Sequence, residues 1–182
     1  MSTTTEAART TLPTVLDLGC GPRKVPGSYG VDRHAYDGVD QVLDLDSPPW
    51  PLPSDHFTEI HARHVIEHVH DVVAFMQEVR RIAAPGCTVT IEAPHFSSLN
   101  AFRDPTHKRY LASSWYEPFT QAYLAAQNPG FEHASTSIKH SSGLTGAMSK
   151  VLCKLFGVEW WEKRMAFVLR ARNFTTVLRV VS

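Results

Sequence analysis

Polar residues and glycines follow one apolar run after another in the first half of this sequence. The runs read as short buried strands; they are TVLDLG (14–19), YGVDR (29–33), QVLDLD (41–46), FTEIHAR (57–63) and TVTIEAP (88–94). At or just after their ends stand Asp17, Gly19, Asp32, Asp44, His64 and His95. In an open parallel sheet, ligands bind beyond the carboxyl ends of the strands. The order of residues therefore predicts a ligand site at one edge of a sheet.

The glycines and carboxylates at that edge suit an adenosine-like ligand. Gly19 and Gly21 let the backbone approach a ligand without a β-carbon in the way. Asp32 can accept both hydroxyls of a ribose, and Asp44 can accept from an adenine amine. A pyrophosphate fits poorly, because Lys24 replaces the third glycine of GxGxxG and no GxxxxGK[ST] loop occurs. An NAD-dependent oxidoreductase is therefore disfavoured, and a plain strand-exit turn stays the simplest alternative for the glycines.

A second polar constellation, PHFSSLNAFRDPTHKRY, spans residues 94–110 and is our candidate acceptor loop. His95 and His107 are candidate catalytic bases because histidine titrates near neutral pH. Asp104 can orient His107. The same carboxylate also suits a helix N-cap, so a purely structural role competes.

Cationic and aromatic side chains of this loop suit an acidic acceptor. Arg103 or Arg109 can hold a carboxylate through two parallel hydrogen bonds, and Tyr110 lies beside them in sequence. We therefore expect Arg103, Arg109 and Tyr110 to bind substrate, with structural pairing of Arg109 as the alternative.

The ordered set of motifs resembles the class I S-adenosylmethionine-dependent methyltransferases of the type-11-like group. LDLGCG, GVDR, LDLD and HVIEHVHDVVAFMQEVRRIAAPGCTVTIEAP match that group, and PHFSSLNAFRDPTHKRY and AFVLRARN are similar to a small bacterial and archaeal subgroup of unassigned methyltransferases. The resemblance implies a Rossmann-like α/β fold, S-adenosyl-L-methionine as cofactor, and a small-molecule acceptor with an N, O or C nucleophile. The cofactor-binding residues that it implies are Asp17, Gly19, Cys20, Gly21, Asp32, Arg33, Asp44, Leu45 and His64.

The remaining periodicity predicts a single domain over residues 13–182 after a tail at 1–12. We expect a mostly parallel, seven-stranded sheet, with helices at 64–84 and 146–157 and further strands at 131–140 and 166–173. Residues 19–28 are too few and too rich in proline for the usual first crossover helix, so that helix is expected to be shortened or missing. The face that it leaves uncovered makes a homodimer possible.

Composition excludes several classes of function. Lysine plus arginine equals aspartate plus glutamate at 18 each, which predicts no nucleic-acid or membrane partner. The three cysteines are widely spaced and no secretion signal precedes them, so we expect free thiols and a cytoplasmic location. Among the ten histidines neither HExxH nor a CxxC pair occurs, so no metal is expected. The alternatives left open are a cofactor-binding module without catalysis and a metal-assisted methyltransferase that uses His95 and His107.

Overall fold

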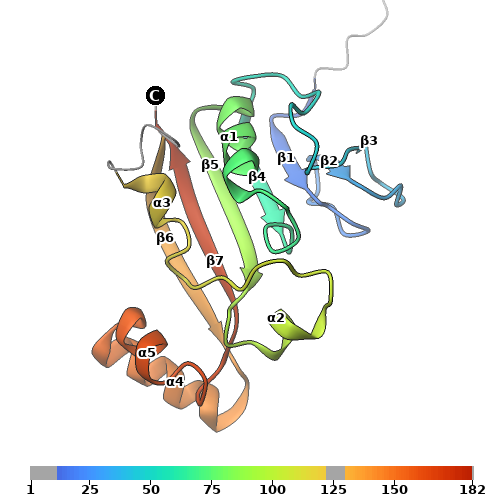
Figure 1. Cartoon of the computed structure of the whole chain (residues 1–182). Helices are drawn as coiled ribbons and strands as arrows, with labels where there is room; N and C mark the ends of the chain where they lie inside the picture. Colours follow the sequence, from blue (N-terminus) through green and yellow to red (C-terminus); the bar gives the residue numbers. More distant parts are fainter. Residues whose placement is uncertain (1–11, 122–129, 182) are drawn as a thin grey trace, which may run out of the picture.

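One mixed sheet unites the strands of the protein (Figure 1). The computed structural model describes residues 12–121 and 130–181, so nearly all of the expected tail at 1–12 lies outside the described residues. Its seven strands follow the order β3-β2-β1-β4-β5-β7-β6. They are β1 (Val15–Leu18), β2 (Tyr29–Asp32), β3 (Gln41–Val42), β4 (Phe57–Arg63), β5 (Ala83–Pro94), β6 (Phe131–His140) and β7 (Ala171–Val180). The first five strands are parallel, and β7 runs antiparallel to both β5 and β6, which confirms the expected α/β architecture.

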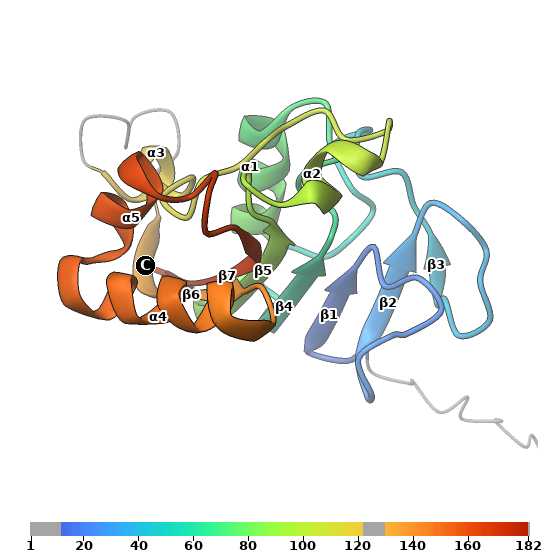
Figure 2. The same ribbon diagram turned by 90° about the horizontal axis from the view of Figure 1, so that it is seen from below.

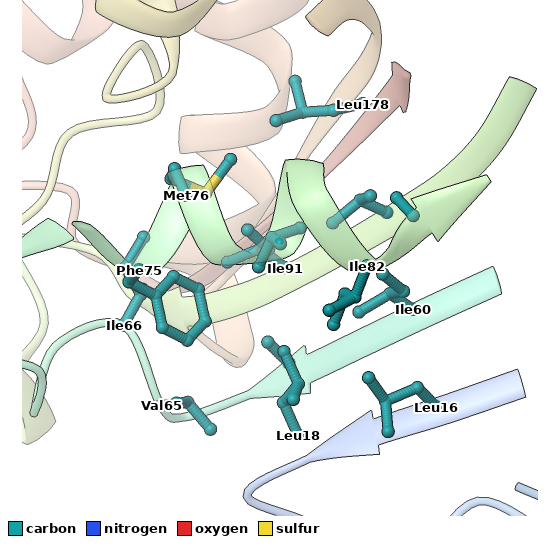
Figure 3. Close-up of a cluster of buried hydrophobic side chains, with 14 of the residues drawn as sticks. Leu16, Leu18, Ile60, Val65, Ile66, Phe75, Met76, Ile82, Ile91 and Leu178 are labelled. Atoms are coloured by element: carbon teal, nitrogen blue, oxygen red, sulfur yellow. The ribbon is translucent and has the colours of Figure 1, made fainter. Parts of the chain in front are cut away.

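Alternation of side chains along the central strands builds the core on one face of the sheet. Leu16 pairs with Ile60 and Ile60 with Val89, and all three side chains are fully buried. Helix α1 (Val72–Ile82) covers this face with an apolar stripe that includes Phe75 (Figure 3). Burial of each large apolar side chain contributes roughly 1.5–3 kcal/mol, so this interface supplies much of the driving force for folding.

The opposite face of the central strands is polar. Its side chains include Glu59 and His61 on β4, which lie 2.8 Å apart, and Thr88 and Thr90 on β5. Figure 2 shows α1 on one side of β4 and β5. Because polar side chains tolerate water, this face of the central strands needs no apolar partner, and a homodimer stays a prediction.

The shortened first crossover is confirmed, since residues 19–28 contain turns and no helix. A buried carboxylate holds this loop in place of helical hydrogen bonds. Asp17 Oδ2 accepts from the N–H of Val25 and from Arg63 Nη2, each at 2.8 Å. The same Arg63 nitrogen donates to the carbonyl of Arg23 at 2.8 Å.

The helix expected at 64–84 is wrong in its first third. Helix α1 starts at Val72, because Asp71 caps it by accepting from the N–H groups of Val73 and Ala74 through Oδ1. The residues before Asp71 form turns that bury Val65 and Val69, so the apolar spacing there was helix-like without a helix.

The strand expected at 41–46 ends after Val42. Asp44 turns the chain, since its Oδ1 accepts from the N–H of Asp46 at 3.0 Å and its carbonyl accepts from Ser47 at 3.1 Å. A carboxylate that bonds the backbone two residues ahead favours a turn over a strand.

The strand expected at 166–173 is wrong before residue 171. Residues 166–169 lie in a turn, in which the carbonyl of Met165 accepts from the N–H groups of Val168 and Leu169. The strand is β7, which starts at Ala171 and buries alternate side chains from Phe174 onward.

Four further helices complete the described part of the chain: α2 (Leu99–Arg103), α3 (Glu117–Thr120), α4 (Gly143–Phe156) and α5 (Val158–Arg164). The last two connect β6 to β7, and α5 was not expected from the sequence. Trp161 of α5 is fully buried beside His95, with ring centroids 5.5 Å apart. The stretch after β5 therefore packs against a helix that lies far along the sequence.

A clamp of charged groups fixes the proline-rich loop before β4 to α1. Glu78 Oε2 accepts from the N–H of Trp50 at 2.8 Å and from Arg81 Nη2 at 2.7 Å. Arg81 also donates to the carbonyls of Trp50 and Leu52. Burial would raise the pKa of Glu78, but these hydrogen bonds outweigh burial and hold it below the usual value. The carboxylate therefore stabilises the fold above its unfolded pKa, and this contribution is lost as the pH falls through the lower, folded pKa.

Within residues 12–121 and 130–181, no helix combines the length and the apolar character needed to cross a membrane.

Arg81→Ala is expected to lower the free energy of unfolding by about 1.5–3 kcal/mol, because Glu78 and two backbone carbonyls lose charged hydrogen bonds. Denaturant titration measures this change. The control is Lys163→Ala, which breaks the exposed Lys163–Glu159 pair and should cost about 0.5 kcal/mol or less. If both variants lost the same free energy of unfolding, the contacts of Arg81 with Glu78 and the loop would not stabilise the fold as described.

Asp71→Ala is expected to cost about 1 kcal/mol, because two N–H groups of the first turn of α1 lose their acceptor. Asp37→Ala, at an exposed position outside any helix, serves as the control. If the melting temperature of Asp71→Ala equalled that of the control, the Asp71 cap would not stabilise α1.

Candidate functional site

A cleft of about 510 Å³ lies at the carboxyl ends of the parallel strands. It brings together seven of the residues that the resemblance implied for the cofactor: Gly19, Gly21, Asp32, Arg33, Asp44, Leu45 and His64. They follow four different strands, and they meet because those strands are parallel neighbours in one sheet. Pockets of this size suit small-molecule ligands.

Two glycines form part of the cleft wall with backbone alone. Gly19 has φ +63°, and a β-carbon there would lie 2.4 Å from Val65 Cγ2. Gly21 has φ +53°, a left-handed conformation that side chains rarely adopt. The chain can therefore bend sharply after β1 and leave the cleft open.

Asp32 at the end of β2 is 8% exposed and lines the cleft. Its Oδ2 accepts from the N–H of Gly21 and its Oδ1 from the N–H of His34, each at 2.9 Å. A carboxylate offers about four acceptor sites. Two therefore remain for the hydroxyls of a ligand.

The part of the cleft beyond β3 combines apolar surface with one carboxylate. Leu43, Leu45 and Val69 line it together with the exposed Asp44. Trp50 holds this segment, since its Nε1 donates to the carbonyl of Leu45 at 3.3 Å. The arrangement suits a flat, largely apolar ring with a polar edge.

Asp17 and Cys20 do not line the cleft, although the resemblance placed both at the cofactor. Asp17 is fully buried and holds the crossover loop, as described above. Cys20 is buried, and burial together with the charges of Asp17 and Asp32 raises the pKa of its thiol. A neutral buried thiol is a poor nucleophile. Their cofactor roles stay predictions, and the geometry favours support of the neighbouring glycines.

The cleft is closed at its far end by the loop after β5, which contributes Asp104, Thr106 and Lys108. Lys108 Nζ lies 3.3 Å from Asp46 Oδ2, and its backbone N–H donates to the carbonyl of Glu67 at 2.8 Å. The polar segment 94–110 is thereby tied to both sides of the cleft.

A second cavity of about 570 Å³ adjoins the first. The two share His64, His68 and Asp104, and Arg103 and His107 line only the second. The segment that contains α2 lies at the carboxyl ends of β4 and β5 (Figure 1). A ligand in the cleft and a second molecule in this cavity would thus face each other across His64, His68 and Asp104.

His64 stands at the boundary with a left-handed φ of +57°. Its Nδ1 lies 3.2 Å from Glu67 Oε1, and its Nε2 lies 3.3 Å from Asn173 Nδ2. The hydrogen bond to Glu67 raises the pKa of His64, and burial opposes it. Tertiary structure alone brings Asn173 of β7 to this boundary.

His95 and His107 occupy different surroundings. His95 is 0% exposed and lines neither cavity; its Nε2 lies 2.8 Å from Glu162 Oε1 and its Nδ1 2.8 Å from Ser97 Oγ. His107 lines the second cavity, and its Nδ1 lies 2.8 Å from the carbonyl of Ala101. Catalytic roles for both stay predictions, and only His107 has the access that such a role needs.

The remaining predicted residues of the acceptor loop divide in the same way. Arg103 lines the second cavity, whereas Arg109 donates to the carbonyl of His70 and lines neither cavity. Tyr110 is 54% exposed and stacks on Phe102, with ring centroids 4.5 Å apart. Substrate contacts by Arg109 and Tyr110 stay predictions without geometric support.

Glu67, His68 and Thr106 also lie at the boundary of the two cavities, although the sequence pattern did not single them out as site residues. Glu67 and His68 were interpreted as part of a helix start, so their convergence with the loop after β5 was not considered. The spacing HVIEH was the available signal, but it matched no metal or catalytic pattern.

Comparison with known proteins places this geometry in a family. A model of the methyltransferase domain matches residues 3–148. No curated protein sequence matches the chain.

Solved structures share the fold at low identity. The YcgJ protein from Bacillus subtilis is 17% identical, with 92% of this chain and 91% of that chain covered and a TM-score of 0.58. An S-adenosylmethionine-dependent methyltransferase from Archaeoglobus fulgidus is 16% identical, with 91% and 85% covered and a TM-score of 0.60. One from Mesorhizobium loti is 14% identical, with 91% and 89% covered and a TM-score of 0.57. The resemblance to the class I methyltransferases is confirmed, and the chain belongs to the methyltransferase domain family. The narrower resemblance of PHFSSLNAFRDPTHKRY and AFVLRARN to one subgroup stays a prediction.

Proposed function

We propose that the protein transfers a methyl group from S-adenosylmethionine to a small molecule that carries an N, O or C nucleophile. S-adenosylmethionine is the methyl donor, and the cleft at the ends of β1, β2 and β4 is the place for it. The observation that carries the proposal is the second cavity, which shares His64, His68 and Asp104 with the cleft. A donor in the cleft and an acceptor in the second cavity would then lie next to each other.

The residues of the cleft fit the donor. Asp32 retains acceptor capacity for the ribose hydroxyls, and Leu43 and Leu45 offer apolar contact to the adenine. Backbone at Gly19 and Gly21 leaves room beside the strand end. The missing first helix is no obstacle, because the donor carries no phosphate that needs a helix N-terminus.

The bound donor supplies a sulfonium methyl group that a nucleophile can attack directly. The protein is left to align the acceptor and to exclude water, which is worth several kcal/mol when the reacting atoms are held in line. His107 can take a proton from the acceptor. Its Nδ1 is engaged with the carbonyl of Ala101, so the free lone pair of the ring is on Nε2. The side chain of Arg103 forms no hydrogen bond or ion pair with the described residues, so its guanidinium is available to an acidic group on the acceptor.

A cofactor-binding module without catalysis is the weaker alternative. It needs no space beside the donor, yet the cavity next to the cleft measures about 570 Å³. Arg103 and His107 give that cavity the groups expected of an acceptor site. Binding alone leaves the position of these side chains without a reason.

The direct test uses a donor with an isotopically labelled methyl group and a whole-cell extract, which contains small molecules, protein and nucleic acid. Mass spectrometry should find the label on a compound of low molecular mass. His107→Gln should lower the rate of labelling more than it lowers the affinity for S-adenosylhomocysteine. Labelling of protein or nucleic acid alone would contradict the proposed acceptor class.

Asp32→Ala should weaken binding of S-adenosylhomocysteine by roughly 1–3 kcal/mol, or about 5- to 150-fold, because the ribose loses its acceptor. Titration calorimetry measures the change. Asp37→Ala removes an exposed carboxylate outside the cleft and should leave the affinity as it is. Asp32→Asn separates ribose binding from support of the loop, since the amide oxygen can still accept one hydrogen bond. Wild-type affinity in both Asp32 variants would remove the ribose assignment.

NAD⁺ should not compete with S-adenosylhomocysteine, because residues 19–28 form no helix whose N-terminus could bind a pyrophosphate. A displacement titration checks this, with adenosine as the positive control. Displacement by NAD⁺ at concentrations where adenosine also displaces would restore the oxidoreductase alternative.

A further inference from the structure

Three side chains at the junction of the two cavities converge as metal ligands do. Glu67, His68 and His107 each offer a ligand atom, and the three atoms lie within 4.8 Å of one another. The rings of His68 and His107 are in edge contact, with centroids 4.7 Å apart. We propose that Glu67, His68 and His107 bind a divalent transition-metal ion. This departs from the sequence-based expectation of no metal, and it shares only His107 with the metal-assisted alternative that the sequence left open.

Glu67 supplies an observation that points to a cation independently of the cluster. Its side chain is only 2% exposed, and its Oε2 is buried without a hydrogen-bond partner among the described residues. The other oxygen, Oε1, faces His64 Nδ1 at 3.2 Å. A buried carboxylate oxygen without a partner is costly, and native proteins rarely retain one without a purpose. A cation at this oxygen would satisfy it.

The hydrogen bonds of His107 prepare it as a ligand. A carbonyl only accepts, so the 2.8 Å contact with the carbonyl of Ala101 places the proton of neutral His107 on Nδ1. The lone pair is then on Nε2. Metal-binding histidines commonly have their other ring nitrogen bound to a backbone carbonyl in this way.

His68 is held similarly by the loop after β5. Its Nδ1 lies 3.0 Å from Thr106 Oγ1 and 3.4 Å from the Thr106 carbonyl. The Thr106 hydroxyl donates to Asp104 Oδ1 at 2.6 Å, so its oxygen is free to accept from His68. The proton of neutral His68 is therefore on Nδ1, and its Nε2 is available to a metal.

The donor set determines the class of ion. Two imidazole nitrogens and one carboxylate oxygen suit Zn²⁺, Co²⁺, Fe²⁺ and similar ions, whereas Mg²⁺ and Ca²⁺ prefer oxygen ligands. Three protein ligands leave at least one coordination position for water or substrate. Glu67 and His107 line the second cavity and His68 lines both, so an open position would lie beside the acceptor.

The location gives the ion a use. With the ion bound, His107 Nε2 is a ligand and no longer a base. A hydroxyl group bound to the ion loses its proton more readily instead, and it would do so next to the cleft for the methyl donor. An acceptor with an oxygen nucleophile is then favoured, a consequence that rests on the proposed function, whereas the metal site itself does not.

The test is metal binding by the full chain after treatment with a chelator. Co²⁺ should bind at a single saturable site with visible absorption bands, and Zn²⁺ should displace it and raise the melting temperature by mass action. Glu67→Gln and His107→Gln should each lower the affinity for Co²⁺ by about tenfold or more, as losses around metal sites commonly do. His133→Gln on β6 is the matched control, because it removes an exposed imidazole remote from the cluster, and its affinity should equal that of the wild type.

Melting of each metal-free variant shows whether it folds, and His68→Gln provides a third variant if one does not. The proposal is overturned if the wild type binds no Co²⁺, or if the folded variants bind it as tightly as His133→Gln does. S-adenosylhomocysteine binding is measured on the same samples. A wild-type protein that binds S-adenosylhomocysteine but no Co²⁺ overturns the metal site alone, and a wild-type protein that binds Co²⁺ but no S-adenosylhomocysteine overturns the proposed function alone.

Discussion

The buried carboxylate of Asp17 is the constraint on which the cleft depends. A crossover without a helix must satisfy its backbone through other partners. Asp17 accepts hydrogen bonds from the N–H of Val25 and the guanidinium of Arg63. Arg63 also donates to the carbonyl of Arg23. This arrangement ties the loop to β1 and β4 at once. The glycines after β1 can then line a cleft that no first helix covers.

The two faces of the sheet have different surroundings: one forms the hydrophobic core, and the other is polar. On one face Leu16, Ile60 and Val89 pack under α1, and on the other Glu59 and His61 meet water. The apolar face alone fixes the register, because a shift of one residue would exchange buried and solvated side chains. Register in turn fixes where each strand ends, and the strand ends hold the groups of the cleft.

The loop after β5 joins the cleft to the second cavity. Its polar side chains have separate tasks that their spacing in sequence does not reveal. Asp104 and Thr106 hold His68, His107 lines the second cavity, and His95 packs in the interior against Glu162. One segment thus contributes both support for the fold and the groups closest to the proposed chemistry.

The local order of residues was enough to predict the sheet, the short crossover and most of the cleft. An apolar run followed by a polar group correctly predicted the end of β2 at Asp32 and the end of β4 just before His64. The limits of helices and strands depend on side-chain hydrogen bonds such as the Asp71 cap, and the periodicity of apolar residues does not predict these bonds. The burial of His95 and the convergence of Glu67 with His107 were decided only by tertiary structure. They depend on contacts across 67 and 40 residues of chain, where packing of distant elements, and not local pattern, sets which atoms meet.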